Sequence, residues 1–152
     1  MFREAINRAY LPFLETLTDF PRIKVSLHTS GPLLEFIEQN HLYAYLDLVR
    51  KLATRGQLEL VGGGFYEPIL QLLPENNRIA QIQLMSDELT RLFGQRPTGL
   101  WLTERAWEPH LARSLALSGV QWTLLDDNGF EKTGLHGTDL FMPTSLRKKG
   151  TR

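Results

Sequence analysis

Hydrophobic positions along the chain change repeatedly between the spacing of a helix and that of a strand. Apolar faces with helical spacing predict five helical segments: 2–19, from Ser30 onward, 42–55, from Pro74 to Gly94, and from Pro109 through Leu117. Apolar runs or alternation between them predict four strands: 23–28, 58–61, 98–102 and 120–125. This order predicts an α/β fold whose parallel strands are joined by right-handed crossovers. An open doubly wound sheet and a β/α barrel both fit it.

Proline and glycine positions set several of the expected boundaries. Pro12 is expected to kink or restart the first helix, while Pro32 suits an early helical position, where its missing N–H costs little. Gly56 and Gly94 follow helical segments and are expected to end them. The last strand is expected to stop at the Asp-Asp-Asn-Gly stretch over 126–129.

Titratable side chains lie in or just after each expected strand. In chain order they are His28, Glu59 with Glu67, Glu104, and Asp126 with Asp127. In parallel α/β folds the carboxyl ends of the strands form the rim at which active sites lie. We therefore expect these side chains to share one site.

Residues 101–109, Trp-Leu-Thr-Glu-Arg-Ala-Trp-Glu-Pro, carry the strongest chemical signal. Glu104 follows an apolar run and lies between Trp101 and Trp107. A carboxylate at the end of a buried strand is costly unless it is paired, and proteins keep such groups mostly where chemistry needs them. Indole rings stack on the apolar faces of sugars. Paired carboxylates on one rim suit glycoside hydrolysis or transfer, with one as nucleophile and the other as general acid.

The alternative for Glu104 is a structural ion pair with Arg105 or another arginine. Adjacent residues on a strand point to opposite faces, so Arg105 is a poor partner if the strand continues through it. This argument favours a catalytic role for Glu104.

The stretch Gly-Gly-Gly over 62–64 leads into Phe65, Tyr66 and Glu67. It lacks the spacing of a phosphate-binding loop. Glycines let a backbone approach a ligand, and the two aromatic rings could stack on one, so a sugar subsite is one interpretation. A tight turn with core aromatics is the other, and the sequence leaves both open.

The role of Asp126 and Asp127 is equally open, because a substrate contact and an ordinary turn both fit their sequence. Among the histidines, only His28 lies at a strand end. The four histidines show no metal-ligand spacing and cysteine is absent, so neither a metal site nor a cofactor is expected.

The composition limits the function classes. The 152 residues contain 17 basic and 17 acidic side chains, so neither a nucleic-acid nor a membrane partner is expected. We see no secretion signal and no apolar run long enough to span a membrane, and we expect a cytoplasmic protein.

We expect a barrel domain over 1–142 and a basic, disordered tail over 143–152.

Two stretches resemble sequence regions of glycoside hydrolase family 57. Residues 56–61, Gly-Gln-Leu-Glu-Leu-Val, resemble its second region, and 62–70 continue as in its glucanotransferase and amylase branch. Residues 101–106, Trp-Leu-Thr-Glu-Arg-Ala, resemble its third region. With residues 9–13 and 27–31, the similarity extends from residue 1 to about residue 142.

The resemblance implies part of a (β/α)7 barrel and a retaining enzyme that acts on α-1,4-glucans, of the α-amylase or 4-α-glucanotransferase type. It implies that Glu104 is the nucleophile that forms the glucosyl–enzyme intermediate. Glu59 would be a substrate-site carboxylate. The further residues expected to contact an α-glucan or maltooligosaccharide are His28, Phe65, Tyr66, Glu67, Trp101, Trp107, Asp126 and Asp127.

The chain also departs from the family pattern. The His-Gln-Pro of the first region is missing, and so is the Asp-Gly-Glu-Lys-Phe-Gly-like fourth region that carries the family's acid/base aspartate. Asn128-Gly129 replaces the usual aromatic residue and histidine after the double Asp. We therefore expect a fragment that is inactive alone and that self-associates through open barrel edges. The alternative is a non-catalytic glucan-binding remnant; a metal-dependent polysaccharide deacetylase is disfavoured because its Asp/His ligand spacing is absent.

Overall fold

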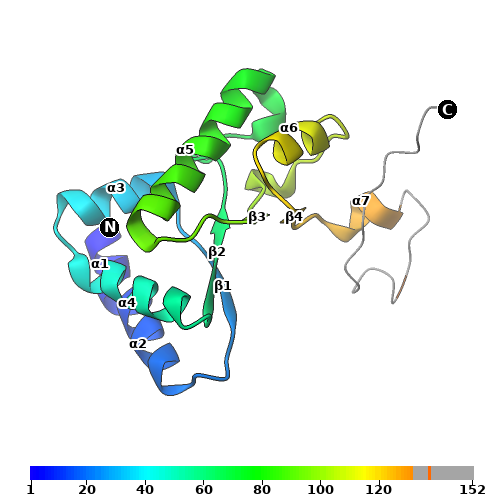
Figure 1. Ribbon diagram of the computed structural model, residues 1–152. Helices are drawn as coiled ribbons and strands as arrows, with labels where there is room; N and C mark the ends of the chain where they lie inside the picture. Colours follow the sequence, from blue (N-terminus) through cyan, green and yellow to red (C-terminus); the bar gives the residue numbers. More distant parts are fainter. Residues whose placement is uncertain (132–136, 138–152) are drawn as a thin grey trace.

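The computed structural model describes residues 1–131 and 137. Four parallel strands form one sheet in the order β1-β2-β3-β4, as Figure 1 shows. The strands are β1 (Val25–His28), β2 (Leu58–Gly62), β3 (Gly99–Leu100) and β4 (Trp122–Thr123). Sequential strands are thus neighbours, and a helical crossover joins each pair. The predicted α/β fold with parallel strands is confirmed.

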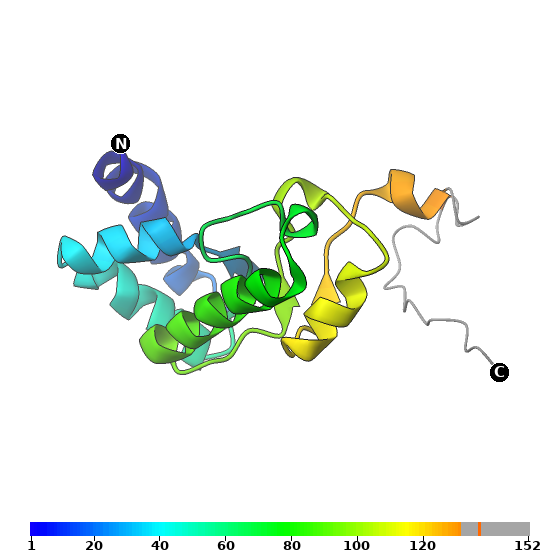
Figure 2. The same cartoon turned by 90° about the horizontal axis from the view of Figure 1, so that it is seen from above.

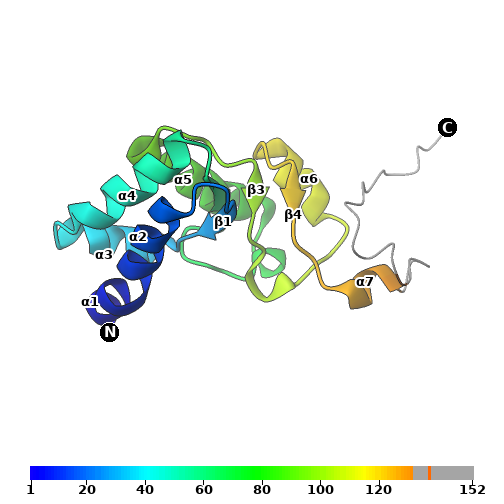
Figure 3. The same ribbon diagram turned by 90° about the horizontal axis from the view of Figure 1, so that it is seen from below.

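Helices precede, connect and follow the strands. They are α1 (Phe2–Ala5), the π-helical segment η1 (Ile6–Tyr10), α2 (Leu11–Asp19), α3 (Gly31–Gln39), α4 (Tyr43–Thr54), the short 3₁₀ turn η2 (Leu70–Leu72), α5 (Glu75–Phe93), a second 3₁₀ turn η3 (Thr103–Arg105), α6 (Leu111–Leu117) and α7 (Asp127–Glu131). The N-terminal helices lie at one end of the described structure and α7 at the other, as the two further views show (Figure 2 and Figure 3).

The first helical segment is irregular in the turn before Pro12. The irregularity is the π-helical segment η1, which precedes Pro12. Pro12 lies in the first turn of α2, which begins at Leu11, so the predicted restart at Pro12 agrees with the structure. The residues before Pro12 are also helical, and a proline there lacks an N–H donor and crowds the preceding turn, which is the irregular one.

One face of the β1–β2 sheet is packed against helices. Leu58 and Leu60 of β2 are buried there with apolar residues of α2, α3, α4 and α5. A second apolar cluster joins Leu100 and Leu102 to α5 and α6. The other face of the sheet carries polar side chains, because residues alternate along a strand. Ser26 and Glu59 lie opposite each other on that face.

The third and fourth strands are shorter than predicted. In each of these strands only two residues are paired with the neighbouring strand. Hydrogen bonds extend the pairing on either side, from Trp101 N–H to the Gly62 carbonyl (2.9 Å) and from Gln121 N–H to the Thr98 carbonyl (2.8 Å). The chain then turns into η3 after β3, and into α7 after β4. The expected turn at 126–129 is therefore partly helical, since α7 begins at Asp127.

A close contact between the first crossover and the loop after β2 makes Gly31 critical for stability. Its N–H donates to the Phe65 carbonyl (3.0 Å), and a Cβ on Gly31 would lie 2.4 Å from that oxygen and from the Phe65 ring. We expect Gly31→Ala to lower the free energy of unfolding by about 1–3 kcal/mol, because backbone must move. Urea denaturation measures this.

The matched control for Gly31→Ala is its neighbour. Ser30 occupies the N-cap of α3 without a side-chain capping bond. We expect Ser30→Ala to change the unfolding free energy by less than about 0.5 kcal/mol. Equal losses in the two variants would contradict the close-contact explanation.

Candidate functional site

The parallel strands end at a common rim. His28 pairs with Val61, Gly62 with Leu100, and Leu100 with Thr123, so the strand ends lie side by side. The segments that follow the strands carry most of the titratable residues expected from the sequence. This is the edge at which parallel α/β folds bind ligands.

His28, Glu67 and Trp101 form a cluster on this rim. The His28 Nδ1 lies 3.1 Å from the Val61 carbonyl oxygen, and its Nε2 lies 3.3 Å from Glu67 Oε1. A carbonyl oxygen can only accept, so Nδ1 donates this bond, and the other ring nitrogen faces the carboxylate. The Trp101 indole stacks on the imidazole at 6.4 Å between ring centroids. Three residues far apart in sequence thus meet at the ends of β1, β2 and β3.

The glycine run after β2 makes room for this cluster. A Cβ on Gly63 would lie 2.8 Å from the Cε1 atom of His28. Glu67 then adopts a left-handed conformation, with φ of 51°, and its N–H donates to the Gly64 carbonyl (3.0 Å). Left-handed backbone in a non-glycine residue is uncommon and is found disproportionately at functional sites.

Glu104 lies in the η3 turn just beyond β3. Glu104 and Arg105 have φ of 55° and 48°, so two consecutive non-glycine residues are left-handed. The two residues do not lie on opposite faces of a strand, contrary to the prediction, because the strand ends at Leu100 and the chain turns here. Glu104 is exposed, and its carboxylate makes no hydrogen bond or ion pair with any residue that the structure describes.

Arg105 pairs with Asp126 rather than with Glu104. Its Nε donates to Asp126 Oδ1, so that this ion pair joins η3 to the segment after β4. The alternative of a Glu104–Arg105 ion pair is therefore not what the described residues form. Asp127, the first residue of α7, lies next to this pair in sequence and is exposed.

Glu59 lies away from the rim. It is the second residue of β2, and its Oε2 accepts a hydrogen bond from Ser26 Oγ (3.0 Å). It lines a hollow of about 450 Å³ together with Lys24, Gly56 and Gln95, near the amino ends of β1 and β2. Glu59 therefore lies on the polar face of the sheet, but it is not part of the cluster at the carboxyl ends of the strands.

The aromatic residues separate into exposed and buried sets. Phe65 is 4% exposed, and its ring packs edge-on against Tyr66. Its burial matches the core-aromatic interpretation, and in this conformation the ring cannot stack on a ligand. Tyr66 is 56% exposed and donates to Glu35 Oε1 (3.3 Å), and the negative charge of Glu35 raises the pKa of Tyr66. Trp107 is half-buried against the second apolar cluster.

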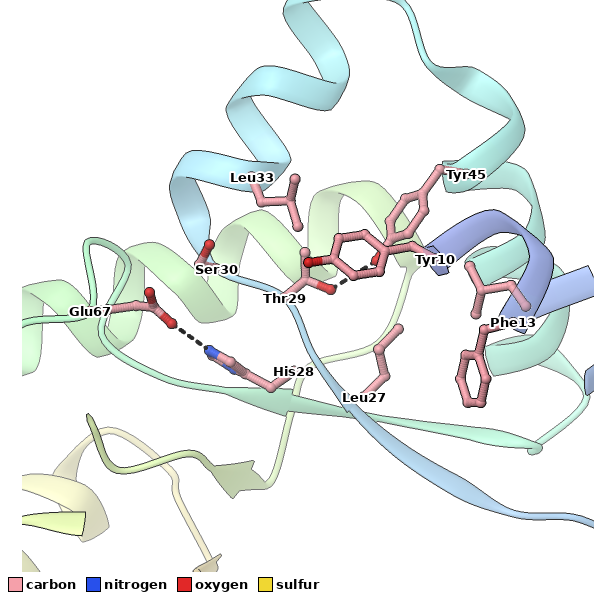
Figure 4. A pocket seen from close by; sticks show the side chains of 10 residues that line it. Tyr10, Phe13, Leu27, His28, Thr29, Ser30, Leu33, Tyr45 and Glu67 are labelled. Atoms are coloured by element: carbon pink, nitrogen blue, oxygen red, sulfur yellow. Dashed lines mark hydrogen bonds and ion pairs between the residues drawn. The ribbon is translucent and has the colours of Figure 1, made fainter. Parts of the chain in front are cut away.

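A pocket that the sequence did not indicate lies beside His28 and Glu67. It has a volume of about 250 Å³, and Figure 4 shows it between the N-terminal helices, the end of β1, and α3 with α4. Its polar lining includes Thr29, whose Oγ1 lies 3.1 Å from the Tyr45 hydroxyl. Burial raises the pKa of Tyr45. Tyr10 adds a second aromatic hydroxyl from η1.

Helical periodicity explains why this pocket was missed. Tyr10 and Tyr45 fit the helical spacing of the segments predicted over 2–19 and 42–55, and their hydroxyls gave no separate signal. Within residues 1–131 and 137, no group of three or more His, Asp or Glu side chains could hold a metal ion. In the same part of the chain, no helix is long and apolar enough to cross a membrane.

Comparisons with known proteins agree on one family. The family model described as glycosyl hydrolase family 57 matches residues 1–150. The chain is 48% identical over 143 residues to a 4-alpha-glucanotransferase of Thermococcus litoralis, covering 94% of this chain and 21% of that protein. It is 46% identical to an alpha-amylase of Pyrococcus furiosus, covering 94% of this chain and 22% of that protein. The chain thus spans about a fifth of these relatives.

Solved structures show a similar fold. The crystal structure of the 4-alpha-glucanotransferase from Thermococcus litoralis superposes with a TM-score of 0.84, at 48% identity, covering 90% of this chain and 22% of that one. An alpha-amylase from Thermotoga maritima superposes with a TM-score of 0.75 at 18% identity, covering 85% of this chain and 35% of that one. A polysaccharide deacetylase from Mycobacterium smegmatis superposes at 0.58 and 16% identity, over 74% of this chain and 36% of that one, a likeness of fold alone.

Proposed function

The chain belongs to glycosyl hydrolase family 57, and from this premise we propose that it carries the nucleophile of a retaining enzyme acting on α-1,4-glucans. In this proposal Glu104 forms the glucosyl–enzyme intermediate. His28, Glu67, Trp101 and Trp107 bind the sugar units around it. The names of the relatives, a 4-alpha-glucanotransferase and alpha-amylases, support this substrate class.

The observation that carries the proposal is the conformation of Glu104. A left-handed non-glycine residue costs about 1–3 kcal/mol and persists only where surrounding contacts impose it. Here the strain places an exposed carboxylate on the rim, with no partner among the described residues to neutralise it. A purely structural glutamate gains nothing from that arrangement, whereas a nucleophile must be free to reach carbon C1 of a sugar.

The proposed reaction has two steps. The Glu104 carboxylate attacks C1, a C–O bond forms, and the glycosidic C–O bond breaks while the leaving oxygen takes a proton from a general acid. Water or another sugar hydroxyl then releases the glucosyl group. Retaining enzymes hold the two carboxyl groups about 5–5.5 Å apart. We propose that the acid lies outside the described residues, because the fourth family region, which carries the family's acid/base aspartate, is not found in this sequence.

The other rim residues have supporting roles in this proposal. The indole faces of Trp101 and Trp107 offer stacking surfaces for sugar rings, while the His28–Glu67 pair offers hydrogen-bonding groups for sugar hydroxyls. Tyr66, Asp127 and Glu59 are exposed, and in this proposal they contact further sugar units. Phe65 supports the loop from within the core.

A non-catalytic glucan-binding protein is the second candidate. It is favoured by the missing fourth family region, since binding needs only the aromatic and hydrogen-bonding groups. The two candidates differ in whether Glu104 can form a bond to sugar.

An activated donor separates the two candidates. In 5-fluoro-α-maltosyl fluoride the fluoride ion leaves without a general acid, and the ring fluorine slows release of the intermediate by destabilising its oxocarbenium-like transition states. We expect the chain to gain the mass of one fluoromaltosyl group, while unmodified maltooligosaccharides bind but turn over slowly for want of the acid. Binding without any covalent adduct would support the second candidate.

We also propose that the chain self-associates through its sheet edges. Among the described strands, β1 and β4 each pair on one side only. An apolar groove of about 310 Å³, lined in part by Trp107, Trp122 and Phe130, lies beside β4. Unpaired edges with apolar neighbours favour association.

A charge beside the β4 edge tests this association. Leu124, half-exposed just after β4, is the site for the change. We expect Leu124→Lys to raise the dissociation constant measured by sedimentation at least about tenfold. The control is Leu72→Lys, on the exposed η2 turn, which is expected to leave association unchanged. A monomeric wild-type chain with a sharp, concentration-independent melt would contradict the proposal.

A further inference from the structure

The turn that carries Glu104 is weakly held by its own backbone. The Arg105 N–H donates to the Leu102 carbonyl at 2.8 Å, but the next bond, from Ala106 N–H to the Thr103 carbonyl, is 3.4 Å long. Two consecutive left-handed residues make this segment intrinsically unfavourable. Contacts from elsewhere in the fold must therefore hold it.

Such a contact comes from the neighbouring strand. Asp126 lies between β4 and α7, and it accepts a hydrogen bond from the Arg105 guanidinium. The ion pair thus joins the turns that follow two adjacent strands, β3 and β4. Because Arg105 directly follows Glu104, anchoring its side chain restricts rotation of the strained peptide that sets the direction of the Glu104 carboxylate.

We infer that Arg105 and Asp126 form a positioning pair for Glu104, an inference that rests on the proposed role of Glu104 as nucleophile. Asp126 then acts through Arg105 and not by touching substrate. The sequence had left Asp126 between a substrate contact and a turn residue, and its bond to Arg105 favours this third role.

The chain offers a matched control for an ordinary surface ion pair. Arg96 and Asp87 are 2.7 Å apart and similarly exposed, but Asp87 lies on α5 and Arg96 just after it, away from the rim turns. Exposed pairs of this kind contribute little to stability. Loss of either pair should therefore leave the fold intact, and only loss of the Arg105–Asp126 pair should alter the reactivity of Glu104.

The test measures the covalent labelling of Glu104 by 5-fluoro-α-maltosyl fluoride as a function of reagent concentration. A misplaced reacting group costs up to about a hundredfold in rate, so we expect Asp126→Asn and Arg105→Gln to lower the saturating rate constant about ten- to a hundredfold. The half-saturating concentration should stay within about twofold, because ligand contacts are unchanged. Asp87→Asn should label at the wild-type rate, and Arg105→Lys, which keeps one donor, should lose less than Arg105→Gln.

The double variant Arg105→Gln/Asp126→Asn gives the decisive comparison. If the two residues act only through their ion pair, the saturating rate constant of the double variant falls no further than that of either single variant. If the loss in the double variant is the product of the two single losses, the residues act independently and the inference is overturned. A raised half-saturating concentration at an unchanged saturating rate would make Asp126 a substrate contact and would also overturn it. Wild-type labelling rates in both single variants would also overturn the inference, while the proposed role of Glu104 would stand because Glu104 is still labelled. A wild-type chain that takes no label at all would remove the proposed function and this inference together.

Discussion

Replacing Arg78 with alanine is expected to lower the free energy of unfolding by about 3–5 kcal/mol, because several polar groups lose their partner in the interior. Arg78 is 3% exposed on α5, a rare position for a guanidinium. It donates to the Leu70 carbonyl (2.9 Å), to the Leu73 carbonyl (2.9 Å) and to Ser114 Oγ (2.9 Å).

These bonds connect the two loops of the candidate site. Leu70 and Leu73 belong to the segment that follows Glu67, while Ser114 lies on α6, which follows the Glu104 turn. A further contact of 3.1 Å joins Arg78 Nη2 to the ring nitrogen Nε2 of His110, just before α6. Loss of Arg78 therefore removes the buried link between η2 and α6, in addition to the packing of its own stem.

Urea denaturation of Arg78→Ala and of a matched variant measures this effect. Arg113, on α6, is well exposed and reaches Glu75 only at 4.0 Å, so Arg113→Ala is expected to cost less than about 0.5 kcal/mol. If the unfolding free energy of Arg78→Ala lies within about 1 kcal/mol of the wild-type value, Arg78 is not an important link between η2 and α6.

Replacing Glu104 with glutamine is expected to reduce the rate of labelling by 5-fluoro-α-maltosyl fluoride at least about a thousandfold, since an amide is a far weaker nucleophile than a carboxylate. Binding of unmodified maltooligosaccharides should persist, because the amide keeps the size of the side chain. Rates of adduct formation by intact mass, together with calorimetric binding, measure the two effects separately.

Glu108 supplies the control for Glu104→Gln. It lies in the same loop and is exposed, but its carboxylate is 2.9 Å from His110 Nδ1. We expect Glu108→Gln to label at close to the wild-type rate. Comparable losses in both variants would point to a general disturbance of the loop rather than to a nucleophile at Glu104.

Long segments with a single period were predictable. The stripe Tyr45, Leu46, Val49 and Leu52 identified α4, and all four residues are buried. In the segment predicted from Pro74 to Gly94, Arg78 is buried one turn before Ile82, while the apolar neighbour Ile79 is only half-buried. An arginine among buried apolar residues is favourable only when carbonyl oxygens from other segments accept its hydrogen bonds. The local sequence does not show which carbonyls will be nearby.

The site was predictable in its residue types but not in its geometry. Strand ends brought His28 and Glu67 together as expected, with Trp101 against them. The left-handed turn at Glu104 depends on contacts between segments that are distant in sequence, including Arg105 with Asp126, so strand alternation gave the wrong direction for these side chains. Phe65 was ambiguous because the backbone that its ring packs closely against, at Gly31, lies more than thirty residues earlier in the sequence.

The most direct test of the account locates the covalent label. After reaction with 5-fluoro-α-maltosyl fluoride, the chain is digested at low pH and the peptides are sequenced by tandem mass spectrometry. We expect the fluoromaltosyl group as an ester on Glu104, within the peptide that contains residues 101–109. A label on Glu59, Glu67 or Asp126, with Glu104 unmodified, would contradict the assignment of Glu104 as the nucleophile.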